Sequence, residues 1–335
     1  MSTAAASPEA VIVTRELRKS YRATTVLDGV DLEVGRGEIF ALLGPNGVGK
    51  TTTVNILTTL IKPDSGSASI AGFDVVREPA RARAALSLTG QFAAVDPFQT
   101  GRENLAMMAK LSHLDRRSAR NRTADLLERF DLGAASVRRV GTYSGGMRRR
   151  LDLAISLLAA PPIVFLDEPT TGLDPRSRSQ MWEVVRELSA SGTTILLTTQ
   201  YLEEADQLAD TIAVLDEGRI VATGTADELK SGLDGDRVEL TFDGDDAYQA
   251  ALGIDFGTSV SLDRDRASIS VPATDPVRTT RELLTVADEH GLAVSNISIL
   301  KPTLDDVFLS LTGAPASATP ASASASTSTS EEVAA

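Results

Sequence analysis

The chain has 335 residues, of which 42% are hydrophobic and 24% are charged, and this suits a globular protein with room for a second, smaller unit. It contains no cysteine, which excludes disulfides and thiolate metal sites, and no apolar run of about 18 residues that could cross a bilayer. The net charge is −13, and residues 231–335 account for −11 of it, with 17 acidic and 6 basic side chains. This acidic balance, without a basic stripe, disfavours nucleic acid as a partner.

The N-terminal part of the chain predicts a frayed end followed by strands. Residues 1–9 are small and acidic, so we expect a disordered segment without an export signal. Strand-like patterns cover residues 11–13 and 26–34, and residues 38–43 form a short apolar strand that ends in a glycine-rich loop. Residues 51–60 then have a helical pattern. A strand, a glycine-rich loop and a helix in this order are the context that a phosphate-binding loop requires.

Helical patterns rich in Leu, Ala, Arg and Glu dominate residues 92–160, and strands and helices alternate again after them. We therefore predict an α/β sheet domain over residues 10–232 that is interrupted by a helical insert. Its later elements are predicted as strands at 163–166, 194–198 and 211–215 and as helices at 179–189 and 202–209.

The composition becomes acidic and glycine-rich near residue 232, and a small α+β domain is predicted over residues 233–313. Its elements are predicted as strands at 236–242, 267–271 and 294–300 and as a helix at 276–289. Residues 314–335 are almost all Ala, Ser, Thr and Pro, with too little apolar surface to offset the entropy of ordering. We predict a disordered tail there.

The glycine-rich loop fits the pattern G-x-x-x-x-G-K-[ST] without a mismatch. Its glycines allow backbone N–H groups to converge on phosphate oxygens at the start of a helix. Lys50 is expected to contact the β- and γ-phosphates, and the Thr51 hydroxyl is expected to bind Mg²⁺. The nucleotide-binding candidates here are Gly44, Asn46, Gly47, Gly49, Lys50, Thr51 and Thr52.

Two carboxylates follow the apolar strand at residues 163–166, at the strand end where ligands bind in open α/β sheets. Asp167 is expected to hold Mg²⁺ through water, and Glu168 to polarise the attacking water. The alternative is a strand that ends in a solvated acidic turn. The phosphate-binding loop in the same chain makes this alternative unfavourable.

A second glycine motif, Ser144-Gly145-Gly146, lies at a predicted helix start. The serine can cap the helix while exposed N–H groups bind an anion, and a plain helix cap is the competing interpretation. The arginines 148–150 that follow could steer a nucleotide, but we predict that they form a solvated helix face.

In chain order the motifs are the phosphate-binding loop, Gln91, Ser144-Gly145-Gly146, Leu166-Asp167-Glu168-Pro169 and Gly172-Leu173-Asp174. This combination, over residues 11–230, resembles the nucleotide-binding subunit of ATP-binding-cassette (ABC) transporters. The resemblance implies a P-loop NTPase (RecA-like) core, and hydrolysis of ATP with Mg²⁺. It also implies that two copies face head to tail, so that each ATP lies between the loop of one chain and the Ser-Gly-Gly motif of the other. A separate membrane permease and a peripheral position on the cytoplasmic side of the membrane are further expectations.

The resemblance also implies roles for three single residues. Tyr21 corresponds to the aromatic residue that stacks on adenine, although a ring near a strand end can also pack in other ways. Gln91 corresponds to the glutamine that reaches Mg²⁺ and water, and its apolar neighbours could contact a membrane partner or pack in the helical insert. Asp174 corresponds to the residue that links the facing monomers.

The chain departs from the family pattern in two places. Tyr143 and Met147 flank the Ser-Gly-Gly motif where Leu and Gln are usual, and Gln200 stands where a histidine is usual. An amide can donate to the γ-phosphate but does not titrate near neutral pH. Glu168 is therefore expected to be the main catalytic group, assisted by Gln200.

The departures make the chain resemble the daunorubicin-resistance type of ABC ATPase, which energises export of drug-like compounds through a separately encoded permease. The segments that carry this resemblance are Leu88 to Asp96, Thr198 to Asp206 and Pro302 to Phe308. In that subgroup the last segment resembles an assembly or regulatory module, and a domain edge with a buried Phe308 is the alternative. The competing function is a soluble ABC ATPase of DNA repair or translation, but the zinc cysteines and long coiled coils typical of such proteins do not occur here.

Overall fold

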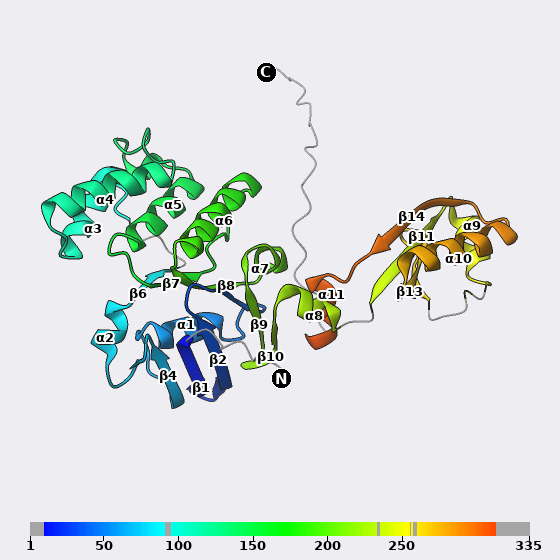
Figure 1. Cartoon of the computed structure of the whole chain (residues 1–335), viewed down its shortest axis with the longest axis horizontal. Helices are drawn as coiled ribbons and strands as arrows, with labels where there is room; N and C mark the ends of the chain where they lie inside the picture. Colours follow the sequence, from blue (N-terminus) through cyan, green and yellow to red (C-terminus); the bar gives the residue numbers. More distant parts are fainter. Residues whose placement is uncertain (1–9, 91–94, 233–234, 255, 257–259, 313–335) are drawn as a thin grey trace, which may run out of the picture.

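The computed structural model describes residues 10–90, 95–232, 235–254, 256 and 260–312. Three predictions, for the ends 1–9 and 314–335 and for Gln91, lie outside these residues. Within them the chain forms three sheets and the helices that cover them (Figure 1). None of the helices in the described part is long and apolar enough to cross a membrane.

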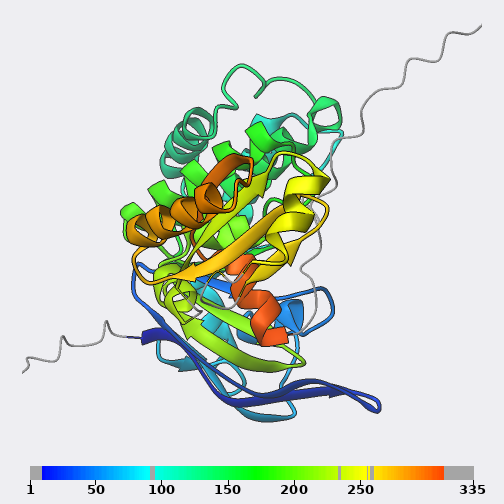
Figure 2. The ribbon, with the colours of Figure 1, turned by 90° about the vertical axis from the view of Figure 1, so that its right-hand side faces the viewer.

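The first sheet is antiparallel and has the strand order β2-β1-β4-β5. Its strands are β1 (Ala10–Tyr21), β2 (Thr24–Gly35), β4 (Ser65–Ile70) and β5 (Phe73–Asp74). The β1–β2 hairpin extends along one edge of the molecule, in dark blue in Figure 2. In β2 the buried side chains of Val30, Leu32 and Val34 alternate with exposed residues, as the period of two in a half-buried strand requires.

The second sheet is the centre of the molecule and has the order β10-β9-β3-β8-β7-β6. All of its pairs are parallel except β9 with β10. Its strands are β3 (Ile39–Leu43), β6 (Leu86–Thr89), β7 (Ile163–Asp167), β8 (Thr194–Thr199), β9 (Thr211–Asp216) and β10 (Arg219–Gly224). Every residue of β3, β7 and β8 is buried, which explains the apolar runs at 39–43, 163–166 and 195–197.

The two faces of the central sheet support separate cores. Phe40 and Leu42 face the core shared with the first sheet and with α1 (Lys50–Leu57), whereas Ala41 and Leu43 face the core shared with the other helices. In Figure 1 helices α3 to α6 therefore lie on one side of the sheet and β1, β2 and β4 on the other. The helices and the 3₁₀ turn are α2 (Pro79–Ala84), α3 (Gly101–Leu111), α4 (Arg116–Arg129), η1 (Val140–Thr142), α5 (Gly145–Ser156), α6 (Pro175–Ala190), α7 (Leu202–Leu208) and α8 (Ala226–Ser231).

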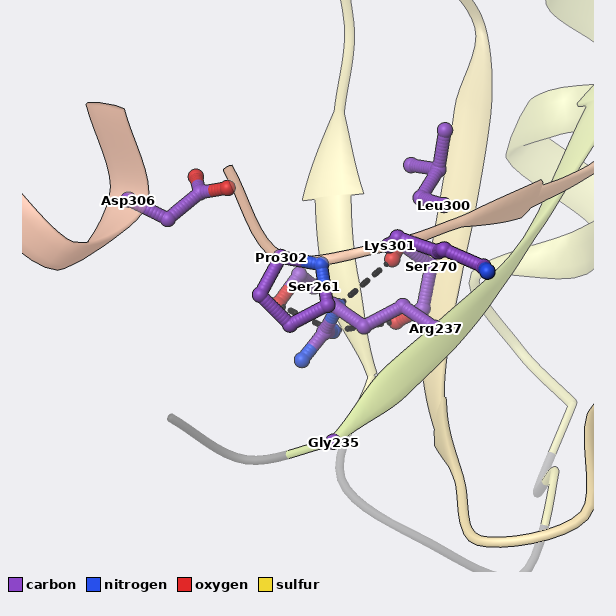
Figure 3. Close-up of a pocket in the computed structure, with 8 residues that line it drawn as sticks. All are labelled: Gly235, Arg237, Ser261, Ser270, Leu300, Lys301, Pro302 and Asp306. Carbon is purple, nitrogen blue, oxygen red and sulfur yellow. Dashed lines mark hydrogen bonds between the residues drawn. The ribbon is translucent and has the colours of Figure 1, made fainter. Parts of the chain in front are cut away.

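The third sheet, of residues 236–300, is antiparallel with the order β12-β13-β11-β14. It comprises β11 (Asp236–Phe242), β12 (Ser261–Asp263), β13 (Ser268–Ala273) and β14 (Val294–Leu300), with α9 (Asp245–Ala251) and α10 (Pro276–Glu289). A cleft of about 430 Å³ lies beside the start of β11, and Figure 3 shows the residues that line it. There the Arg237 guanidinium donates to both the hydroxyl and the carbonyl oxygen of Ser270 and to the hydroxyl of Ser261, each at 2.7 Å.

The last described helix, α11 (Leu304–Thr312), leaves this unit and packs against α7 and α8. Thr303 and Asp306 cap its start reciprocally, at 2.8 and 3.2 Å. Leu304, Val307 and Phe308 are buried in the same core as the helices on the central sheet. The interpretation in which Phe308 is buried at a domain edge therefore agrees with the structure.

The structure agrees with the predicted α/β core, helical insert and small α+β unit, and it adds elements that the sequence patterns did not indicate. Strand β4 was missed because Ser-Gly-Ser-Ala-Ser-Ile has little of the β-branched and aromatic character typical of strands. The predicted helix at 51–60 is too long, since α1 ends at Leu57 and Thr59 adopts φ +66°. The predicted helix at 179–189 is too short, since Asp174 caps α6 and the helix begins at Pro175, four residues before the predicted start.

Candidate nucleotide site

The phosphate-binding loop joins the end of β3 to the start of α1. A Cβ atom at Gly44 would lie 2.3 Å from the Leu215 carbonyl oxygen, so only glycine fits beside the neighbouring strand. Gly47 and Gly49 adopt φ +89° and +113°, a region that favours glycine. No side chain of the described residues caps α1. The first N–H groups of this helix are therefore available for phosphate oxygens.

Lys50 lies at the first position of α1 and is only 4% exposed. Its Nζ atom donates to the carbonyl oxygens of Gly44 at 2.7 Å and Pro45 at 2.9 Å, and lies 3.6 Å from Glu168 Oε1. Burial lowers the pKa of Lys50, while the carboxylates of Glu168 and Asp167 act in the opposite direction. The ammonium group is thus held over the loop by weak acceptors, which a phosphate can replace.

Asp167, the last residue of β7, lies beside the loop. Its Oδ1 atom accepts hydrogen bonds from the Thr198 hydroxyl at 2.5 Å and the Thr51 hydroxyl at 3.3 Å. A carboxylate and a hydroxyl at this separation are oxygen ligands of the kind that Mg²⁺ prefers next to bound phosphates. The donor set therefore fits a magnesium ion shared with a nucleotide.

Glu168 follows Asp167 in a left-handed backbone conformation with φ +48°. Its N–H group donates to the carbonyl oxygen and the hydroxyl of Thr198, at 3.2 and 3.1 Å, and Thr171 Oγ1 donates to Glu168 Oε2 at 3.2 Å. Strain of this kind persists only where the surroundings hold it, and it concentrates at functional sites. The side chain lines a cleft of about 140 Å³ together with Val26, Asn46, Gly47, Gly49, Lys50, Thr51 and Thr52.

Gln200 comes directly after β8, the strand that lies between β3 and β7. It is half-buried at the same edge of the sheet as the loop and the two carboxylates. It does not line the 140 Å³ cleft. Its role toward a nucleotide stays a prediction.

The Ser-Gly-Gly motif is at the start of α5. Ser144 caps the helix by accepting from the Met147 N–H at 3.2 Å, and Ser144 and Gly145 are exposed. A Cβ atom at Gly146 would lie 2.6 Å from Ser177 Oγ, so this glycine allows α5 and α6 to approach closely. The motif is a helix cap, as one interpretation predicted, and its exposed side is open to a ligand or a second chain.

Asp174 is the cap of α6 within its own chain. It accepts from the Ser177 N–H at 3.0 Å and from the Ser177 hydroxyl at 2.7 Å, and these bonds lower the pKa of its carboxyl group.

Tyr21 is the last residue of β1 and is 47% exposed. The centroid of its ring lies 5.6 Å from Lys19 Nζ. It does not line the cleft at the loop, so its contact with adenine also stays a prediction.

Comparison with known proteins assigns the family. Residues 27–171 match the family model described as "ABC transporter", and residues 224–312 match "ATP-binding protein DrrA1-3-like, C-terminal domain". The chain is 50% identical over 295 residues to the daunorubicin resistance ATP-binding protein DrrA3 of Streptomyces coeruleorubidus, covering 88% of this chain and 93% of that protein. The chain belongs to the ATP-binding subunits of ABC transporters, in the daunorubicin-resistance type.

Other similarities agree with this family. The linearmycin resistance ATP-binding protein LnrL of Bacillus subtilis is 33% identical to this chain over 300 residues. The matched region covers 89% of this chain and 96% of LnrL. A solved ATP-binding subunit of an ABC transporter is 31% identical with a TM-score of 0.60, covering 66% of this chain and 92% of that one. The predicted P-loop NTPase fold is therefore confirmed. This ABC subunit is an ATPase, and the comparisons favour a transport function over one in DNA repair or translation.

Several residues around the site were not indicated by the sequence. Thr198 and Thr171 orient the two carboxylates, but a threonine in a strand or turn carries no distinctive signal. The predicted solvated face for arginines 148–150 is wrong for Arg149, which is 9% exposed and donates to backbone carbonyls. Its neighbour Arg148 is exposed, as predicted.

Glu204 is a fully buried carboxyl group on α7, four residues after Gln200. Its Oε1 atom accepts a hydrogen bond from Trp182 Nε1 of α6 at 3.2 Å. Burial raises the pKa of Glu204 above its ordinary value of 4.5, against the opposing effects of Thr199, Thr170, Trp182 and the Arg178 charge. Burial thus shifts the titration of this carboxyl group toward its protonated form.

This pKa shift predicts a pH dependence of stability. The folded chain retains the Glu204 proton at pH values where the unfolded chain has lost it, so its contribution to the free energy of unfolding is fully present below pH 4.5. The contribution falls as the pH rises from 4.5 to the raised folded pKa. Glu204→Gln keeps an acceptor for Trp182 and does not titrate, so its stability relative to the wild type should increase over this range.

Urea unfolding between pH 5 and 8 measures this difference. Glu183→Gln is the matched control, because Glu183 is exposed on α6 next to Trp182. If the difference in free energy of unfolding between the wild type and Glu204→Gln does not change with pH, Glu204 is ionised in the folded chain.

Proposed function

We propose that this ABC subunit powers export of a drug-like compound through a separately encoded membrane permease. The observation that carries the proposal is the convergence of the phosphate-binding loop, Asp167 and Glu168 at one sheet edge, in a chain whose relatives are named for resistance and export. These include the daunorubicin and linearmycin resistance proteins and the Nod factor export ATP-binding protein I of Ralstonia nicotianae, which is 39% identical over 298 residues.

In the proposed mechanism the chain's own groups bind the phosphates of ATP, orient them and deprotonate the attacking water. The loop N–H groups and Lys50 hold the phosphates, and Thr51 and Asp167 would hold Mg²⁺, which supplies charge neutralisation at the phosphate oxygens. Glu168 accepts a proton from the attacking water. Gln200, at the end of β8, donates a hydrogen bond to the γ-phosphate in place of the usual histidine.

The proposed site is completed by a second copy of the chain. Ser144 and Gly145 are exposed at the start of α5, a 12-residue helix whose dipole favours an anion there. The composite arrangement of the family requires that this exposed end bind the γ-phosphate of a nucleotide on the partner's loop. Two copies in a head-to-tail dimer would then enclose two ATP molecules.

The proposed contact with the permease lies in the helical insert, and it would hold the chain on the cytoplasmic side of the membrane. Phe98 is 81% exposed in the turn that precedes α3, whereas Val95 packs against the core. The Phe98 N–H donates to Asp96 Oδ1 at 2.8 Å, which helps to fix the turn that presents the ring. An exposed aromatic ring on a fixed turn is typical of an interface anchor.

Glu168→Gln tests the catalytic part of the proposal. The amide preserves size but cannot accept the proton from water, so ATP should bind with little change while turnover falls at least ~100-fold. An ATP-bound dimer should accumulate and be detected by size-exclusion chromatography. Glu203→Gln is a matched control at an exposed position. Near-normal turnover in Glu168→Gln would remove Glu168 from its assigned role.

Co-purification tests the transport part. The chain should co-purify from membranes with its permease when the two are co-expressed, and Phe98→Ala should reduce the recovered complex at least ~10-fold if the ring is an interface anchor. Val137→Ala removes a 71% exposed apolar side chain elsewhere on the insert and should leave recovery unchanged. A chain that never associates with any candidate permease would contradict export.

A further inference from the structure

Arg149 occupies an unusual position for an arginine in a run of three. It lies on the second turn of α5, five residues after Ser144, and its guanidinium is buried between the helix and the central sheet. Nε donates to the Pro169 carbonyl oxygen at 3.0 Å, and Nη2 donates to the carbonyl oxygens of Asp167 and Glu168 at 3.0 and 3.1 Å. Nη1 donates to the carbonyl oxygen of Gly90.

These four acceptors come from two segments beside the proposed nucleotide site. Asp167 to Pro169 carry the carboxylates proposed for Mg²⁺ and water, and Gly90 directly precedes Gln91. Glu168 adopts φ +48°, a conformation that requires support from its surroundings. Arg149 supplies part of this support, because it donates to the carbonyl oxygens of three consecutive residues, Asp167, Glu168 and Pro169.

The geometry suits arginine and no other side chain. The guanidinium presents five donors in a fixed plane, whereas the lysine ammonium is a compact group that cannot reach both segments in the same way. Asp152 Oδ2 lies 3.8 Å from Nη1 on the same helix and offsets the buried charge. Burial lowers the pKa of Arg149, and the carboxylates of Asp152, Asp167 and Glu168 oppose this effect. Arginine keeps its charge in proteins, so the group remains a cation.

Helix α5 connects this network to the exposed Ser-Gly-Gly motif. Ser144 is about 7.5 Å from Arg149 along the helix axis, at about 1.5 Å per residue. An α-helix transmits a displacement of its first turn to its second turn with little loss, since both belong to one hydrogen-bonded ladder. A ligand bound at Ser144 and Gly145 therefore acts mechanically on the backbone of Glu168 and Gly90.

We propose that Arg149 is a positioning residue that couples the two ATP sites of the dimer. It ties the helix that binds the partner's nucleotide to the backbone of Glu168, which acts on the nucleotide of its own chain. Closure of the dimer at one site thus sets the position of the water-activating carboxylate at the other. The inference rests on the proposed head-to-tail dimer.

Arg149→Lys tests the coupling, with Arg148→Lys as the matched control on the exposed face of the same helix. ATP turnover of the purified chain is measured against ATP concentration, and binding is measured with a fluorescent ATP analogue. We expect Arg149→Lys to bind the analogue within about threefold of the wild type, while kcat falls at least ~10-fold because the carboxylate is misplaced. Cooperativity in ATP should be lost, with a Hill coefficient near one, and Arg148→Lys should behave as the wild type.

A purely structural role predicts a different result. Arg149→Lys would then lower the thermal midpoint, but the folded fraction would keep wild-type kcat and cooperativity, and this outcome would overturn the proposal. Since the assay uses the purified chain, absence of a permease partner would contradict export without affecting the test. Absence of ATP-dependent dimers in the wild type would contradict the dimer itself.

Hydrogen–deuterium exchange of a chain that retains Arg149 covers the case in which Arg149→Lys does not fold. At saturating ATP in the Glu168→Gln background, raising the protein concentration drives dimer formation without changing occupancy of the loop. We expect residues 145–150 and 86–90 to gain protection together. Protection of residues 145–150 alone would overturn the coupling.

Discussion

The parallel pairing of β8 with β3 on one side and β7 on the other is the interaction on which the site depends. Thr199 pairs with Leu43, the last residue before the phosphate-binding loop, and Thr198 pairs with Asp167. Parallel strands end at the same edge of a sheet, so this register places Lys50 Nζ 3.6 Å from Glu168 Oε1 although the two residues are far apart in sequence. A shift of one residue would turn the buried side chains of β8 to the wrong core.

Buried polar groups connect the helices to that edge. Arg149 joins α5 to the carbonyl groups beyond β7, and Glu204 joins α7 to Trp182 on α6. Such groups are costly to bury unless they are paired, which means that the helices have little freedom to shift relative to the sheet. Helix α11 adds Leu304, Val307 and Phe308 to the same core, so the C-terminal segment also contacts the elements that follow Gln200.

The sequence predicted the geometry of the loop and of the strand ends wherever chemistry restricts the residue type. A loop that must approach phosphates needs glycine at positions 44, 47 and 49, and a buried strand before two carboxylates is a continuous apolar run. It was insufficient where a role depends on packing. Arg149 is indistinguishable from Arg148 in the sequence, because only the helix rotation decides which of them faces the sheet. Strand β4 was missed for a related reason, since its small polar residues are held by pairing with β1 and not by their own propensity.

The claim that a nucleotide lies between the loop of one chain and the Ser-Gly-Gly motif of another can be tested by cross-linking, because the chain contains no cysteine. Asn46→Cys and Gly145→Cys are introduced into separate Glu168→Gln chains, which are mixed and treated with a short bismaleimide. The account predicts a cross-link between the two different chains that requires ATP. It also predicts no cross-link when either variant is treated alone. A product that forms without ATP, or between identical chains only, would contradict it.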